Sequence, residues 1–439
     1  MRGVALPDLR LRVASPGLLA LPWQTPLRDW DATEVPLRDV PVGPSRHLVR
    51  FVETDGALWA LKELPQRIAE KEYAVLRDLE QRSLPAVRPA GRVIQPDEGN
   101  AILVTHFLKD SWQYRRLFMR LPAEQPKHRA RLLDAMASLL VDLHRHGVFW
   151  GDCSLANTLF SRDGQLLQAW LVDAETSEVH PALSDGQRLH DLDIMVENVA
   201  GGMLDLAVRL DRPPEVYDDL IDEAASVGTR YQALWDVLHA EPIISFDERF
   251  QIEGQIRKLH ELGFAVDEVA LVPAGHGDAL RLKVAVADRH YHASQLRDLT
   301  GLVAGEGQAT ILLGDLRAYQ GQLQQESRAP VPDSVAARRW VNEILTPGMD
   351  RAHIAAGGVG SPIQAYCDLL EVRWLLSERA GRDVGDEVAL EALARRAVPS
   401  EAAATMAIAD AHTGQLPAIS AAELAMDHED AKLFLATDD

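Results

Sequence analysis

The sequence predicts an α+β protein in which a small antiparallel β-rich lobe precedes a mainly helical lobe. An α+β accessory domain and a helical C-terminal region are expected to follow these two lobes. Three patterns favour this class. Residues 47–64 ("HLVRFVETDGALWALKEL") form two β-prone runs around an Asp-Gly turn. From about Lys127 to His146, apolar residues recur at helical spacing, and "AWLVDAE" (169–175) ends a second hairpin that follows this helix.

Composition limits the class of protein. A chain of 439 residues is long enough for two or three domains. The formal net charge of −21 repels nucleic-acid phosphates, so nucleic-acid binding would need a strong local basic patch and is not expected. The two cysteines, Cys153 and Cys367, match no metal-ligand spacing. We find no signal peptide or transmembrane segment and expect a cytoplasmic protein.

Changes in composition and periodicity divide the chain into five segments. The expected order is an irregular N-terminal arm, the β-rich lobe, the helical lobe, the accessory domain and the helical region with an acidic, frayed tail. These segments correspond to residues 1–35, 36–110, 111–240, 245–330 and 331–439. The last two segments carry no recognisable catalytic set, and we expect them to serve substrate selection, regulation, self-association or a protein partner.

A lysine and a glutamate on consecutive elements are the first candidate site residues. In "ALWALKEL", strand alternation places Ala60 and Lys62 on one face. In the following helix, Glu72 shares its face with an apolar stripe at i+3, i+4 and i+7. A buried lysine and a buried glutamate each need a partner of opposite charge, and each could supply it to the other. Taken alone, Lys62 could instead extend its amine to solvent.

Three polar residues further along the chain extend the pattern. In "WGDCSLANTLF" (150–160), a long helix leads into Asp152, and Asn157 follows before an apolar run. Asp173 ends the apolar strand of "AWLVDAE". Each signal is weak alone, since an aspartate at a strand end is often a cap or turn residue. Their order favours a phosphoryl-transfer site, in which Asp152 accepts a hydroxyl proton while Asn157 and Asp173 bind Mg²⁺.

Residues 36–240 resemble the protein-kinase-like superfamily, in the branch of aminoglycoside phosphotransferases and of lipopolysaccharide kinases that act on Kdo or heptose. "WGDCSLANTLF" is similar to their HGD-x-x-x-x-N loop, with Trp150 in place of the usual histidine. "LVDAE" is similar to their magnesium-binding strand end, without its glycine. "HDLDIMVENVA" (190–200) is similar to the helix in which Asp191 would hold the catalytic loop. The whole chain also resembles an uncharacterised bacterial family of kinase-like proteins.

The resemblance implies ATP and Mg²⁺ as the nucleotide and metal. Lys62 would hold the α- and β-phosphates, Glu72 would hold Lys62, and Ala60 would line the nucleotide site. Between the first two strands, "VPVGPSRH" has one glycine, Gly43, where kinases have a Gly-x-Gly-x-x-Gly loop. Ser45 and Arg46 could still cover the phosphates, but an ordinary turn is an equal alternative.

We therefore expect transfer of the γ-phosphoryl group of ATP to a hydroxyl of a non-protein acceptor, such as a sugar, a glycolipid or a small metabolite. The short interval between Asp173 and Asp191 leaves no room for the peptide-binding segment of protein kinases. Two alternatives remain: a pseudokinase acting as a nucleotide-binding scaffold, and an atypical protein kinase. His144 and His146, at the end of the long helix, are expected to interact with the helix dipole rather than to act in catalysis.

Overall fold

The computed structural model describes residues 7–40, 46–95, 99–114, 126–245, 248, 250–274 and 279–395. Side chains of residues 126–128 and 279 are not among those described. Helices and antiparallel sheets are mixed along the chain, so the predicted α+β class is confirmed. None of the described helices is long and apolar enough to cross a membrane.

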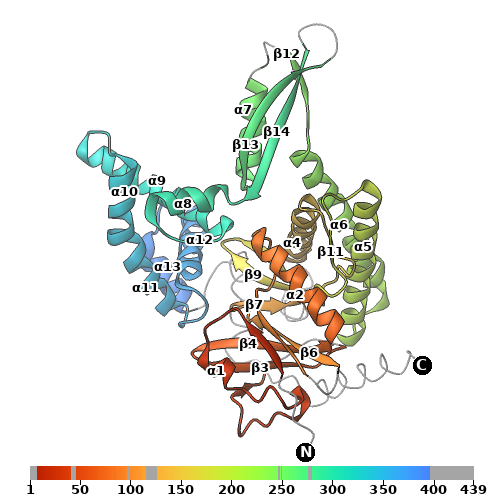
Figure 1. Cartoon of the computed structure of the whole chain (residues 1–439). Helices are drawn as coiled ribbons and strands as arrows, with labels where there is room; N and C mark the ends of the chain where they lie inside the picture. Colours follow the sequence, from red (N-terminus) through yellow and green to blue (C-terminus); the bar gives the residue numbers. More distant parts are fainter. Residues whose placement is uncertain are drawn as a thin grey trace, which may run out of the picture.

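The N-terminal part is built on a six-stranded antiparallel sheet with the order β1-β5-β6-β4-β3-β2 (Figure 1). Asp55 and Gly56 close the predicted hairpin between β3 and β4 with φ of +52° and +74°, the backbone region that Asp-Gly turns favour. Helix α2 (Gln66–Gln81) leads from β4 to β5. The strands are β1 (Asp8–Leu11), β2 (Leu37–Arg38), β3 (Val49–Thr54), β4 (Ala57–Pro65), β5 (Pro89–Ile94) and β6 (Asn100–His106).

The N-terminal arm is more ordered than the expected irregular segment. Its first described residues form β1, which pairs with β5 at the edge of the sheet. A short helix, α1 (Pro16–Leu19), and a 3₁₀ turn (Leu27–Asp29) follow. The indoles of Trp23 and Trp30 are buried against one face of the sheet. Burying two large aromatic side chains in this way anchors the arm.

Three long helices and two small antiparallel sheets follow. The predicted helix near 127–146 and the predicted hairpin before Asp173 are both present as α4 and β9–β10. One continuous apolar core joins these helices to α2. The elements are β7 (Ser111–Gln113), α4 (Pro126–Arg145), β8 (Val148–Phe149), β9 (Thr158–Asp163), β10 (Leu166–Leu171), β11 (Glu178–Val179), α5 (Asp185–Arg209) and α6 (Tyr217–Leu238).

The next segment contains a helix, two long strands and two further helices in that order. Strands β13 and β14 form a long hairpin that projects from the rest of the molecule, with β12 pairing near its tip (Figure 1). Beyond it, helices α8 and α9 share an apolar core with α10–α13, and this core crosses the expected boundary at residue 330. The elements are β12 (Ile243–Ser245), α7 (Phe250–Glu261), β13 (Phe264–Pro273), β14 (Ala279–Arg289), α8 (Tyr291–Thr300), α9 (Glu306–Ser327), α10 (Asp333–Trp340), a π-helical turn (Val341–Leu345), α11 (Thr346–Ala355), α12 (Pro362–Ala380) and α13 (Gly385–Ala394).

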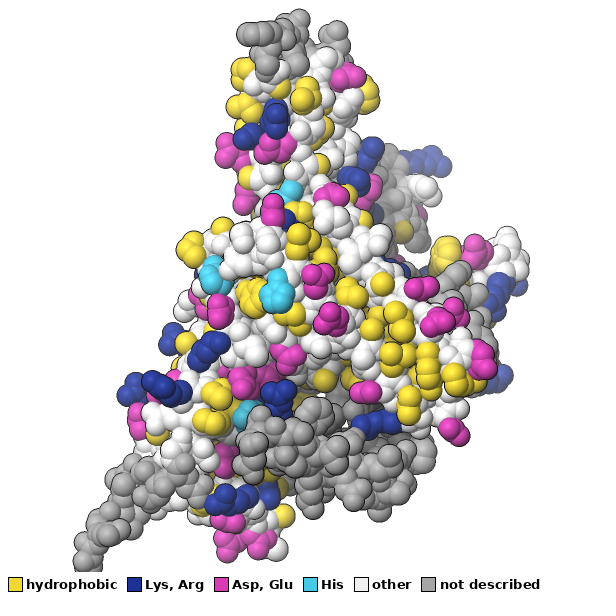
Figure 2. All heavy atoms as spheres, turned by 90° about the vertical axis from the view of Figure 1, so that its right-hand side faces the viewer, with side chains coloured by type: hydrophobic (Ala, Val, Ile, Leu, Met, Phe, Trp, Pro, Cys, Tyr) yellow, Lys and Arg dark blue, Asp and Glu magenta, His cyan; other side chains and the backbone are white. Residues whose placement is uncertain are grey.

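Figure 2 views the molecule from the side of α5 and α6. On the part of this face that the structure describes, acidic and basic side chains are interspersed and hydrophobic side chains lie between them. The expected acidic tail lies outside the described residues.

Candidate active site

Lys62 and Glu72 meet as the sequence predicts. Alternation along β4 turns Trp59 and Leu61 toward the N-terminal core, and Ala60 and Lys62 toward the opposite face. Glu72 lies on the buried face of α2, with only 1% of its surface exposed. The Lys62 Nζ atom donates to both carboxylate oxygens of Glu72, at 3.1 and 3.3 Å. The pair therefore satisfies two groups that would be costly to bury separately.

Asp173 joins this pair from the end of the β9–β10 hairpin. Its Oδ2 atom lies 2.7 Å from Lys62 Nζ, and the backbone N–H of Ala174 donates to Glu72 Oε1 at 3.4 Å. Burial raises the pKa of Glu72 to about 7, Lys62 opposes this shift, and the charge of Asp173 adds to it. Burial lowers the pKa of Lys62, but the charges of Glu72 and Asp173 outweigh this effect and raise it overall. Lys62 is therefore held as a cation.

The loop that carries Asp152 is fixed by Asp191 of α5. The two Asp191 oxygens accept the backbone N–H groups of Trp150 at 2.7 Å and Gly151 at 2.8 Å. Oδ1 also accepts the Cys153 thiol. Burial acts to raise the pKa of Asp191, but the hydrogen bonds that it accepts lower it overall, so the carboxylate stays ionised. Gly151 has a φ of +81°, where a side chain would be strained.

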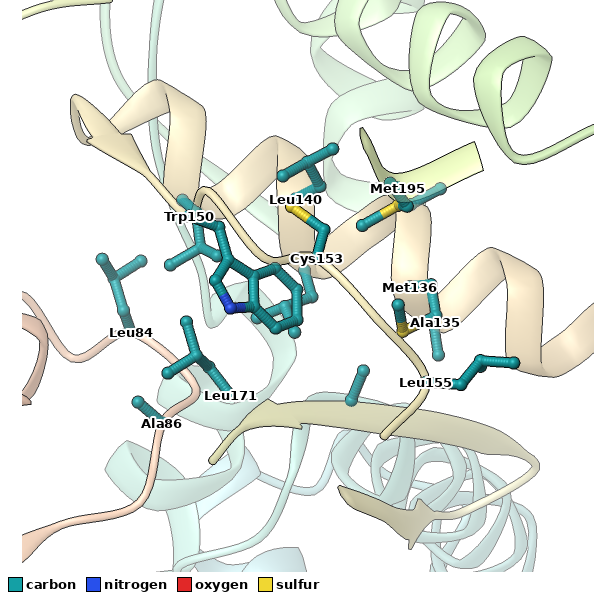
Figure 3. Packing of buried hydrophobic residues seen from close by; sticks show 14 of the residues in the cluster. Leu84, Ala86, Ala135, Met136, Leu140, Trp150, Cys153, Leu155, Leu171 and Met195 are labelled. Carbon is teal, nitrogen blue, oxygen red and sulfur yellow. The ribbon is translucent and has the colours of Figure 1, made fainter. Parts of the chain in front are cut away.

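Trp150 occupies the position where the family usually has histidine, and its indole is fully buried. Figure 3 shows it packed among Leu84, Ala86 and Leu171. The indole N–H points to the backbone carbonyl of Asp173 at 3.3 Å. Trp150 thus packs the loop against the strand end that carries Asp173. The loop is therefore anchored although it has tryptophan in place of the usual histidine.

Asp152 and Asn157 lie in hydrogen-bond contact. The Asn157 amide N–H₂ donates to Asp152 Oδ2 at 2.8 Å, which leaves the Asn157 amide oxygen available for another partner. The other Asp152 oxygen accepts a hydrogen bond from the side chain of Asn198 on α5 at 3.2 Å. Asn198 also donates to the carbonyl of Cys153. The Asp152 carboxylate is therefore oriented from both sides.

These groups line one cavity of about 330 Å³ between the N-terminal sheet and the loops that follow α4. The cavity brings together Ala60, Lys62, Glu72, Asp152, Asn157 and Asp173, and Arg46 lies at its edge. At the same edge, His47 Nε2 lies 3.1 Å from Glu175 Oε2. Gly43 and Ser45 are outside the described residues, so their expected contact with phosphates stays a prediction. Asp191 does not line the cavity. It holds the loop that carries Asp152 by accepting hydrogen bonds from the loop backbone.

His144 differs from its expected role. Its ring is fully buried, with Nε2 3.0 Å from Asp191 Oδ2 and Nδ1 2.8 Å from the hydroxyl of Tyr231. Burial lowers the pKa of His144, although Asp191 acts to raise it. A neutral, buried imidazole has little interaction with a helix dipole, so that prediction was wrong. The i, i+4 spacing of apolar residues before His144 could have indicated its burial.

The oxygen donors of this cavity suit a hard cation. A carboxylate on Asp173 and the free amide oxygen of Asn157 are ligands that Mg²⁺ accepts. The N–H of Val172 donates to the backbone carbonyl of Asn157. Because Asp173 follows Val172, this bond holds Asn157 and Asp173 close together at the open end of the hairpin. Among the described residues there is no group of three or more His, Cys, Asp or Glu side chains that could hold a metal alone. Magnesium sites with few protein ligands usually complete their coordination with substrate phosphates.

Comparison with known proteins gives two family matches. Residues 56–205 match the model of the lipopolysaccharide kinase (Kdo/WaaP) family, a span that includes Lys62 and Asp191 and the residues between them described above. Residues 233–398 match a domain of unknown function, DUF4032. None of the curated protein sequences gives a match.

A solved structure of WaaP in complex with acyl carrier protein is similar to this chain at 18% identity. The match covers 45% of this chain and 88% of that chain, with a TM-score of 0.30. The family match supports a kinase-type phosphotransferase. Over residues 56–205 this chain resembles the lipopolysaccharide kinases of the protein-kinase-like superfamily, and its C-terminal part carries the domain of unknown function.

Proposed function

We propose that this protein is an ATP- and magnesium-dependent phosphotransferase that moves the γ-phosphoryl group to a hydroxyl of a sugar, a glycolipid or a small metabolite. In this proposal the N-terminal sheet with α2 is the small lobe of a two-lobed kinase fold, and α4–α6 form the large lobe. The nucleotide lies in the cavity between them. Residues 245–439 would serve the acceptor, regulation, self-association or a protein partner.

One observation carries the proposal: Lys62 contacts Glu72 and Asp173 within the cavity that also contains Asp152 and Asn157. Placing three carboxylates and a lysine in one partly buried cavity costs desolvation free energy. A functional role would explain why the protein keeps this arrangement. The Lys62 ammonium, held by Glu72 from behind, can pair with nucleotide phosphates. The fixed geometry of this pair means that little reorganisation is needed when phosphates arrive.

Asp152 has the orientation of a general base. Asn157 and Asn198 hold its carboxylate by hydrogen bonds to both oxygens, and both oxygens retain further lone pairs. In the proposed step, the acceptor oxygen bonds to the γ-phosphorus as the bond from that phosphorus to the β,γ-bridging oxygen breaks. The hydroxyl proton passes to Asp152, and ADP leaves. Asp191 and Trp150 keep the loop in place during this exchange.

When bound, Mg²⁺ neutralises charge on the phosphates. Asn157 and Asp173 would hold it. Release of Asp173 from Lys62 would free one carboxylate oxygen for the metal and the Lys62 ammonium for the nucleotide. The direct 2.7 Å contact between these two side chains keeps both charges paired until then.

The similarity to lipopolysaccharide kinases and the short segment between β11 and α5 favour a non-protein acceptor. A pseudokinase is the second candidate. The single glycine at position 43 favours it, because one glycine gives a backbone fewer ways to approach phosphates closely. An atypical protein kinase is the third, and autophosphorylation of the purified protein would reveal it.

The test is turnover of ATP with a panel of sugars and glycolipids, using wild type, Asp152→Asn and Asp193→Asn. Asp193 lies exposed on α5, one residue beyond Leu192, so it is a matched control. We expect turnover that depends on an acceptor, falls by at least about a hundredfold in Asp152→Asn and is unchanged in Asp193→Asn. Nucleotide binding without phosphoryl transfer to any acceptor would favour the pseudokinase. Full activity of Asp152→Asn would exclude the assigned role of this residue.

A further inference from the structure

The turn of the β9–β10 hairpin is held by two helices of the C-terminal part. Arg162, at the end of β9, forms a bidentate ion pair with Asp368 of α12, with N–O distances of 2.8 and 2.5 Å. Only 2% and 7% of these two side chains are exposed. The planar guanidinium and carboxylate fix each other in direction as well as distance. This pair joins segments that are far apart in the sequence.

The next two residues of the turn make a second set of contacts. The Asp163 carboxylate accepts the N–H groups of Gly307 and Gln308, at 2.8 and 2.9 Å, in the first turn of α9. The side-chain amide of Gln364 on α12 exchanges two hydrogen bonds of 3.0 Å with the backbone of Gly164. We call these six residues (Arg162, Asp163, Gly164, Gly307, Gln364 and Asp368) the turn clamp.

Glycine is needed where the two backbones touch. A Cβ atom on Gly307 would lie 2.2 Å from the carbonyl oxygen of Asp163. Gly164 has a φ of +63°, and a Cβ there would lie 2.9 Å from the backbone of Gly307. Such contacts leave no space for a methyl group without moving the turn or α9. The clamp is therefore a tightly packed, directional contact.

The opposite end of the same hairpin carries the proposed magnesium ligands. Six antiparallel residue pairs, from Thr158–Leu171 to Asp163–Leu166, connect the turn to this end. Asn157 directly precedes Thr158, and the N–H of Val172 donates to the Asn157 carbonyl at 3.1 Å. A hairpin of this length spans about 20 Å and transmits a tilt of its turn to its open end. Strand β7 and the loop after α2 hold the middle and the open end of the hairpin, and α4 packs against β10. The clamp, together with the N–H of Gln308, holds the turn.

We propose that the turn clamp makes the C-terminal helices α8–α13 a positioning element for the proposed metal site. Arg162 and Asp368 are then positioning residues that set the direction of the hairpin and thereby the placement of Asn157 and Asp173. This inference rests on the proposed function. The inference assigns a role to the region that matches the domain of unknown function. Contact between this region and the hairpin turn would set the magnesium concentration that nucleotide binding requires.

Two variants of the full chain disturb the clamp in different ways. Gly307→Ala inserts a methyl group between the turn and α9, and Asp368→Asn removes the charge that pairs with Arg162. Gly314→Ala is the matched control, because Gly314 lies in the same helix and a Cβ there meets nothing within 4 Å. The readouts are the affinity for a nonhydrolysable ATP analogue as magnesium is varied, and hydrogen exchange of the β9 and β10 amides. Circular dichroism establishes that each variant is folded.

We expect Gly307→Ala and Asp368→Asn to raise the magnesium concentration for half-maximal binding by about tenfold, the usual cost of losing an outer partner of a metal ligand. Amides of β9 and β10 should exchange faster, while binding without magnesium changes little. Gly314→Ala should match wild type. A folded Gly307→Ala or Asp368→Asn protein with the wild-type magnesium requirement would overturn the inference. Absence of magnesium-dependent binding in wild type would instead overturn the proposed function on which it rests.

Discussion

Replacing Asp191 with asparagine should destabilise the catalytic loop far more than a single neutral hydrogen bond would suggest. The Asp191 oxygens accept bonds from Trp150, Gly151, Cys153 and His144, two bonds to each oxygen. In asparagine one oxygen becomes an N–H₂ group, which must then face a backbone N–H. Leaving one buried backbone N–H without an acceptor costs about 1–3 kcal/mol, and replacing charge-assisted bonds by neutral ones costs about 1 kcal/mol more.

We therefore expect Asp191→Asn to lower the free energy of unfolding by about 3 kcal/mol. Urea denaturation followed by tryptophan fluorescence measures this quantity, and Asp193→Asn on the exposed side of the same helix is the control. The hydrogen bonds also lower the pKa of Asp191. The ionised Asp191 carboxylate therefore stabilises the fold at pH values above its unfolded-state pKa, near 4. This stabilisation is lost as the pH falls below that value.

Asp191→Asn should accordingly lose less stability on acidification than wild type, because it lacks this titrating group. A decrease in the unfolding free energy of less than about 0.5 kcal/mol, the size of an ordinary surface substitution, would refute the assignment of Asp191 as the residue that holds the loop.

Three further predictions concern Trp150, Asn198 and Glu72. Trp150→His should lower the free energy of unfolding by about 2–4 kcal/mol, because it leaves a cavity among Leu84, Ala86 and Leu171; urea denaturation that shows no loss would contradict this packing. Asn198→Leu should reduce turnover by about tenfold while nucleotide affinity stays close to wild type, since Asn198 bonds Asp152 and the carbonyl of Cys153 but does not line the nucleotide cavity; an equal loss of affinity in calorimetry would indicate a general distortion instead. Because burial raises the pKa of Glu72 to about 7, its contribution to stability is present below the unfolded value near 4.5 and is lost as the pH rises through about 7. Glu72→Gln should therefore show a smaller decrease in stability over that interval, and an unchanged slope would show that Glu72 titrates outside it.

The hairpin ends and the long helices were predictable because their patterns are local. Asp55-Gly56 needs only the turn preference of two residues, and α4 needs only its apolar spacing. The Lys62–Glu72 pair was also predictable, since strand alternation and helical periodicity each place one residue on the inward face. In the same way, Asn198 lies seven residues after Asp191 on one face of α5, and this spacing could have indicated that it points to the same loop.

Contacts between distant segments were not predictable. Nothing near Arg162 in the sequence indicates that Asp368 will bury its charge, because the pairing depends on how α12 packs against the hairpin turn. The contact of His47 with Glu175 also depends on how distant segments pack. The sequence shows only that a glutamate stands where the kinases it resembles have a glycine after the metal-binding aspartate. The apolar spacing of α4 indicates that His144 is buried, but it does not reveal the partners of the ring, Tyr231 of α6 and Asp191 of α5.

The central claim is that Lys62, Asn157 and Asp173 form one site for a magnesium-bound nucleotide. Calorimetry of ATP binding with and without Mg²⁺, on wild type, Asp173→Asn and the control Asp193→Asn, tests it most directly. We predict that wild type and Asp193→Asn bind ATP tightly only when Mg²⁺ is present, and that Asp173→Asn loses this magnesium dependence. Equal binding by Asp173→Asn and wild type at every magnesium concentration, or no binding by wild type, would contradict the claim.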